Sequence, residues 1–101
     1  MAGTQKKTTR KTVKAGKDLV ESTIDNFKEK LLKIVNQEIK ELSIDMKTVK
    51  HIDSTGLGML IAAKNSLDQT GGQLNLKDFS EDIGSLLQIL GLESFFNINA
   101  A

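Results

Sequence analysis

The chain has 101 residues, of which 39% are hydrophobic, and carries a formal net charge of +1 at pH 7. This length is typical of one domain, and the hydrophobic fraction is sufficient for one modest core. The absence of cysteine excludes disulfides, thiolate zinc sites and cysteine nucleophiles. No apolar run approaches the ~20 residues of a membrane-spanning helix, and none follows the basic N-terminus as in a secretory signal. We therefore expect a cytoplasmic protein without direct membrane insertion.

The charge is distributed unevenly along the chain. Residues 1–17 contain six basic residues and no acidic one, whereas the remainder contains eight basic and 13 acidic residues. We interpret residues 1–7 as a disordered basic arm and residues 8–101 as the folded domain. The arm has no aromatic residue to stack on bases, and an acidic body repels a phosphate backbone. The sequence therefore predicts no nucleic-acid partner.

The first half of the chain predicts a strand, a helix and a strand. Residues 8–15 favour a short strand, and the lysines there suit an exposed sheet edge. Apolar residues at spacings of three and four then predict a helix from Val20 towards Ile39, with Asp18 or Ser22 as its N-cap. Alternation over residues 42–46 predicts the next strand. The apolar positions of the helix are Val20, Ile24, Phe27, Leu31, Ile34 and Val35.

The second half repeats this alternation. A helix is expected from Leu57 to the glycines at 71 and 72, then a strand over residues 74–76 and a helix opened by Ser80. Residues 95–98 suit either a last strand or a docked tail. We expect their phenylalanines to cover the core, and a dimer patch is the alternative. The order β-α-β-α-β-α-β predicts an α/β domain. Its sheet is small and mixed but mostly parallel, with about four strands and three to four helices.

The residues from His51 to Leu60 join a strand to a helix, where sites form in such folds. They match neither a dinucleotide fingerprint, a phosphate-binding P-loop nor a nucleophile elbow. A His51–Ser54 pair lacks an orienting acid, and one histidine with the scattered acids Asp45 and Asp53 lacks metal-ligand spacing. We therefore predict a protein that is not an enzyme and has no cofactor, catalytic residue or metal site.

Two roles then remain open for the hydroxyl groups of Ser54 and Thr55. Either can cap the helix, which is typically worth ~1 kcal/mol. Either can instead be phosphorylated, which adds a charge of about −1.5 to −2 near the positive end of the helix dipole. Asp53 would repel that charge, whereas Lys47, Lys50 and His51 would partly offset the repulsion.

The segment from Leu42 to Gly58 resembles the signature of the STAS family, which is named for sulfate transporters and anti-sigma-factor antagonists. The family pattern is an alternating strand followed by Asp-Ser-Ser/Thr-Gly-Leu-Gly opening a helix. Here Asp53-Ser-Thr-Gly-Leu-Gly58 fits that pattern, and the resemblance covers roughly residues 16–98. It implies one STAS domain over residues 8–101, with a shortened or missing first strand because members usually have two strands before the first helix.

For a stand-alone member, the resemblance implies a partner switch. Ser54 matches the phosphorylated serine, and Thr55 matches a second hydroxyl that is either another phosphorylation site or a helix cap. The unmodified bacterial protein would bind a serine kinase that is also an anti-sigma factor, and a PP2C-type phosphatase would reverse the modification. The implied partner-binding surface contains Asp18, Lys47, Lys50, His51, Asp53, Ser54, Gly56, Leu57 and Gly58.

One departure keeps other roles open. Many antagonists have Gly-Glu-Leu-Asp at the corner before the first helix, but here Gly16-Lys-Asp-Leu-Val20 displaces the acid. The alternatives are a non-catalytic STAS subunit of a lipid-transporting ABC complex and a regulator associated with chemotaxis or two-component proteins. Nucleotide binding around Ser54–Gly58 is disfavoured by the missing P-loop lysine. The oligomeric state does not follow from the sequence.

Overall fold

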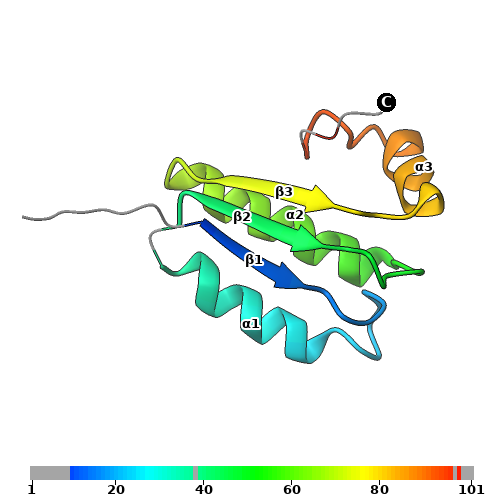
Figure 1. Ribbon diagram of the computed structural model, residues 1–101, viewed down its shortest axis with the longest axis horizontal. Coiled ribbons are helices and arrows are strands. Elements are labelled where there is room, and N and C mark those ends of the chain that lie inside the picture. Colours follow the sequence, from blue (N-terminus) through cyan, green and yellow to red (C-terminus); the bar gives the residue numbers. More distant parts are fainter. Residues whose placement is uncertain (1–9, 38, 97, 99–101) are drawn as a thin grey trace, which may run out of the picture.

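The computed structural model describes residues 10–37, 39–96 and 98, so the basic arm at residues 1–7 lies outside the described residues. Three strands and three helices alternate along the chain (Figure 1). The predicted α/β class and alternating order are confirmed. The elements are β1 (Arg10–Lys14), α1 (Asp25–Val35), β2 (Glu41–Asp45), α2 (Ser54–Gln69), β3 (Gln73–Lys77) and α3 (Glu81–Ile89).

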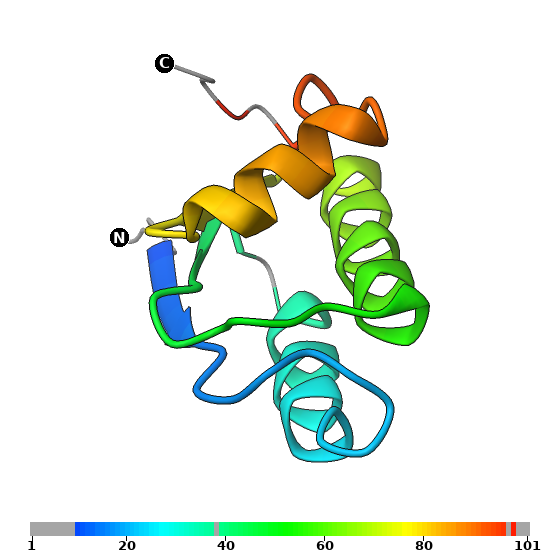
Figure 2. The same cartoon turned by 90° about the vertical axis from the view of Figure 1, so that its right-hand side faces the viewer.

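The described strands form one parallel sheet in the order β1-β2-β3. Right-handed crossovers that always step in the same direction place α1 and α2 on the same face of this sheet. Figures 1 and 2 show the two helices side by side on that face, with α3 near the carboxyl end of β3. Among the described strands, the lysine-rich β1 lies at one edge of the sheet, as its composition predicted.

The core lies between the sheet and the two helices. Leu42 and Ile44 of the central strand have no exposed surface, and Leu74 and Leu76 lie beside them in register on β3. Burying such a side chain contributes roughly 1.5–3 kcal/mol. The core is completed by other side chains without exposed surface, which are Met46, Val49, Leu60, Leu87 and Phe96.

Helix α1 begins at Asp25, later than the apolar stripe predicted. Its N-cap is Ile24, which makes no side-chain capping bond, so the expected caps Asp18 and Ser22 are wrong. The reason is tertiary. Leu19 forms an isolated parallel bridge with Ile52, and a turn follows before the helix can start. The backbone N–H and carbonyl of Leu19 therefore bond to the other loop and are not available for an earlier helical turn.

The segment after α3 is the docked tail rather than a fourth strand. Phe95 and Phe96 lie in turns, and their rings meet edge to face at 5.0 Å between centroids. Phe96 is fully buried, which confirms its expected place in the core. The described residues thus form three strands instead of about four, and one strand precedes α1. The turns after Gly91 bury the ring of Phe96, so the burial of this ring does not require a fourth strand.

Unlike the start of α1, the start of α3 and the end of α2 lie where the sequence predicted them. Ser80 caps α3, as predicted, by accepting a hydrogen bond from the N–H of Ile83 at 3.2 Å. Helix α2 ends at two glycines, also as predicted. Gly71 has φ +80°, and the next N–H returns to the carbonyl of Leu67 at 2.7 Å. A left-handed residue at this position is what lets the chain leave the helix and enter β3.

Candidate functional site

The site lies beyond the carboxyl ends of the strands, where the β1–α1 and β2–α2 loops meet (Figure 2). Asp53 is the N-cap of α2, with extended backbone angles, and one of its carboxylate oxygens accepts from the N–H of Gly56 at 3.0 Å. Neither Ser54 nor Thr55 is the cap, so that expectation for Thr55 is wrong. Asp53 precedes the helix and has the extended backbone that N-caps require, whereas both hydroxyl residues are already helical.

The second carboxylate oxygen of Asp53 reaches the other loop. It accepts a hydrogen bond from the backbone N–H of Glu21 at 2.9 Å. One side chain therefore satisfies a donor at the start of α2 and a donor in the segment before α1. The predicted partner-surface residue Asp53 is thus also a structural tie between loops that are 32 positions apart in sequence.

Asp18 also links the two loops, with its side chain in the β1–α1 loop and its backbone donors in the β2–α2 loop. Its carboxylate accepts from the backbone N–H groups of Lys50 at 2.8 Å and His51 at 3.1 Å. This explains the displaced acid at the corner after Gly16, because the carboxylate there holds the segment that leads into the motif. The side chain is half-buried and already engaged with backbone donors.

Backbone contacts complete the junction between the two loops. The N–H of Leu19 donates to the carbonyl of His51 at 3.0 Å, and the N–H of Asp53 donates to the carbonyl of Leu19 at 3.2 Å. Gly56 packs directly against this bridge, where a Cβ atom would lie 1.9 Å from the carbonyl oxygen of Leu19. The motif therefore needs glycine at 56 for close approach, and Gly56 is buried rather than part of an exposed surface.

Hydrogen bonds to the ionised form lower both carboxyl pKa values below their ordinary 3.8. For Asp53, the N–H of Gly56 has the largest effect on the pKa, followed by the N–H of Glu21. For Asp18, the N–H of Lys50 has the largest effect, partial desolvation opposes it, and His51 lowers the pKa further. Both acids are therefore charged at neutral pH and hold the junction in one geometry.

Several predicted site residues remain accessible around this junction. Ser54 is exposed as the first residue of α2, and Thr55 is exposed beside it. Lys47, Lys50 and His51 are exposed in the β2–α2 loop. Because Asp53 already accepts from the helix amide of Gly56, a charge added at Ser54 would change the outer surface more than the internal bonding.

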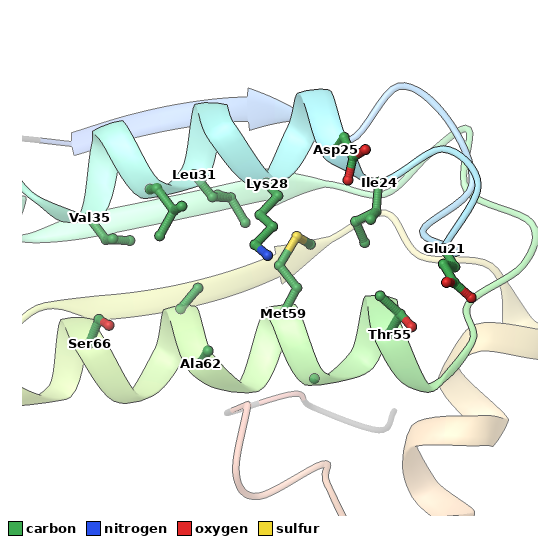
Figure 3. A pocket seen from close by; sticks show the side chains of 13 residues that line it. Glu21, Ile24, Asp25, Lys28, Leu31, Val35, Thr55, Met59, Ala62 and Ser66 are labelled. Atoms are coloured by element: carbon green, nitrogen blue, oxygen red, sulfur yellow. The ribbon is translucent and has the colours of Figure 1, made fainter.

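A groove between α1 and α2 adjoins the site and was not anticipated from the sequence (Figure 3). Its volume is about 390 Å³. Leu57 is half-buried against the core, whereas Gly58 opens onto this groove. The signal in the sequence was Leu32, an apolar residue of α1 that lies outside the predicted stripe and is exposed in the structure. The α1–α2 groove is lined by Glu21, Ile24, Asp25, Lys28, Leu31, Leu32, Val35, Thr55, Gly58, Met59, Ala62, Ala63 and Ser66.

The described residues contain no group of three His, Cys, Asp or Glu side chains suited to holding a metal ion. Within the same residues, no helix is both long and apolar enough to cross a membrane. The side chains exposed at the junction carry hydroxyl, amine and imidazole groups.

Comparison with known proteins agrees with the motif and the fold. The chain matches the STAS domain over residues 4–101. It is 29% identical over 87 residues to the anti-sigma-B factor antagonist of Staphylococcus aureus (strain NCTC 8325 / PS 47), covering 86% of this chain and 81% of that protein. It is 30% identical, with the same coverage, to the anti-sigma-B factor antagonist of Staphylococcus epidermidis. A match over nearly the whole chain, with the motif at the start of α2, places this protein in the STAS domain family.

Proposed function

We propose that this chain is a non-catalytic, cytoplasmic partner switch controlled by phosphorylation of Ser54. In its unmodified form it binds a serine kinase that is also an anti-sigma factor, and the phosphorylated form releases that partner. A PP2C-type phosphatase then restores binding. The resemblance to two anti-sigma-B factor antagonists supports this class of function.

The observation that carries the proposal is the position of Ser54. Its side chain is exposed at the first residue of α2, directly beside a junction fixed by Asp18 and Asp53. Such a hydroxyl can be reached by a kinase without unfolding. A phosphate there adds a charge of about −1.5 to −2 next to the ionised Asp53. It would repel a negative partner surface, and an apolar partner surface would bury the charge at a desolvation cost.

The partner-binding surface is proposed to include the accessible residues around Ser54. Lys47, Lys50 and His51 contribute positive or titratable groups, and Gly58 leaves the first turn of α2 uncrowded. Leu57 and Gly56 support the surface from within. Thr55 is exposed as well and is proposed as a secondary phosphorylation site.

The test compares wild type with Ser54→Ala and Ser54→Asp as bait in the native cell, followed by phosphosite mapping. Wild type and Ser54→Ala should retain a serine kinase, and Ser54→Asp should lose it. Ser85→Asp places the same charge on an exposed serine of α3 and should behave as wild type.

Other outcomes would contradict the switch. Equal recovery of the kinase by both Ser54 variants would remove the regulatory role of the residue. A transporter complex recovered with all baits would instead support the role of an ABC-complex subunit. Recovery of chemotaxis or two-component proteins without a sigma-controlling kinase would support the other alternative.

A further inference from the structure

The α1 side of the α1–α2 groove presents charges in a fixed order. Asp25, Lys28, Leu32 and Val35 are spaced by three, four and three residues, so they form one stripe along the helix. Glu21 adds a second acid at the end where the helix begins. The groove is therefore acidic at this end, basic about one turn further along, and apolar beyond.

These charged groups are available to a ligand. Glu21, Asp25 and Lys28 are exposed, and the ion pairs found among the described residues lie in the sheet and within α2 instead. Figure 3 shows the amine of Lys28 directed into the groove, towards Met59 on the facing helix. The ammonium group of Lys28 lies beside apolar side chains of the groove. It can therefore pair with an acidic group of a ligand whose neighbouring surface is apolar.

The α2 side supplies space. Gly58 and Ala62 are small and leave the groove open, while Met59 is a flexible side chain that adapts to different shapes. Leu32 on the opposite rim is 52% exposed, so it offers apolar surface to a ligand in the groove. The volume of about 390 Å³ can accommodate a few side chains of a partner.

We propose that the α1–α2 groove binds an amphipathic segment of a protein partner. The segment carries a basic residue that faces Glu21 and Asp25. An acidic residue one turn further on faces Lys28, and aliphatic residues beyond it pack on Leu32. This occupant is chosen because its charge order complements that of the groove. The interaction requires no modification of Ser54, so it goes beyond the proposed switch, although Thr55 and Gly58 place the two surfaces side by side.

The test uses two synthetic helical peptides of identical composition. The matched peptide has an arginine at one end, a glutamate one turn in and leucines beyond, and the swapped peptide exchanges the arginine and the glutamate. Titrated against the full chain by fluorescence anisotropy, the matched peptide should bind about tenfold more tightly, since two favourable charge pairs become two unfavourable ones.

Charge reversal in the protein should invert this preference. The variant Asp25→Lys/Lys28→Glu should bind the swapped peptide more tightly. The variant Glu29→Lys/Lys30→Glu makes the same exchange on α1 at positions outside the groove and should keep the original preference. If the reversed variant fails to fold, Glu21→Gln/Asp25→Asn/Lys28→Gln removes all three charges of the groove and should abolish the preference instead.

A steric pair tests the location independently. Ala62→Phe fills the groove and should remove binding of the matched peptide, whereas Asn65→Phe on the same helix lies outside the groove and should not. Equal affinities for both peptides, or a preference unmoved by charge reversal, would overturn the proposal. So would binding of dodecylphosphocholine in the groove without binding of either peptide, which would assign it to an amphiphile. None of these results depends on Ser54, so the two proposals fail separately.

Discussion

The carboxylate of Asp53 accepts a hydrogen bond from the backbone N–H of Glu21 at 2.9 Å, although the two residues lie in different loops. Its other oxygen caps α2 through Gly56. The residue that begins the motif helix therefore also fixes the approach to α1. One ionised side chain therefore holds backbone donors of two loops through charge-assisted hydrogen bonds.

Two substitutions of Asp53 should lower the melting temperature by different amounts. Asp53→Asn keeps one side-chain oxygen for the cap but loses the second acceptor for Glu21, so it should lower the melting temperature less than Asp53→Ala. Thermal unfolding followed by circular dichroism gives the order. Glu29→Ala, at an exposed position of α1, is the control and should change little. No loss for Asp53→Asn would show that the tie to Glu21 contributes nothing, and equal losses for both substitutions would show that the cap on Gly56 contributes nothing beyond that tie.

Stability should decrease in acid because of Asp18 and Asp53. Both pKa values are lower in the folded protein than the ordinary 3.8, so the folded state favours the ionised form. Their contribution is therefore complete well above pH 3.8 and is lost as the pH falls from about that value through the lower folded values. Urea unfolding between pH 6 and pH 2.5 measures this. Asp18→Asn/Asp53→Asn should have a flatter profile, and an unchanged slope would contradict the assignment.

Alanine substitutions at two glycines of the motif should change the free energy of unfolding in opposite directions. At Gly56 the new Cβ meets the carbonyl of Leu19, which cannot move without breaking the loop junction, so a loss of about 3 kcal/mol is expected. At Gly58 a Cβ meets nothing within 4 Å, so alanine should stabilise α2 by about 0.5–1 kcal/mol. Chemical unfolding of the two variants compares them directly, and a similar effect at both positions would be inconsistent with the packing.

The docked tail should contribute to the core. Phe96 is fully buried, so Phe96→Ala should cost about 3–5 kcal/mol of unfolding free energy. Ile89 is 80% exposed on α3, and Ile89→Ala should remain within about 0.5 kcal/mol of wild type. Equilibrium unfolding in urea measures both. A Phe96 variant as stable as wild type would show that the tail does not pack against the domain.

Much of the fold could be predicted from local pattern. Alternation specified β2, glycine positions ended α2, and Ser80 preceded α3 at the expected place. These features depend on neighbours in sequence, so their signals are present in the chain itself. The start of α1 could not be predicted in this way, because the pairing of Leu19 with Ile52 competes with the helical stripe.

The sequence by itself determined the α/β order, the motif from Asp53 to Gly58 and Ser54 as the candidate switch residue. Only the tertiary structure decided that Asp53 also holds the backbone at Glu21, that Asp18 holds the backbone at Lys50 and His51, and that a groove opens between α1 and α2. The physical reason is that capping and apolar periodicity act within a few residues. Ties between loops, and the space left between two helices, depend on segments more than 30 positions apart.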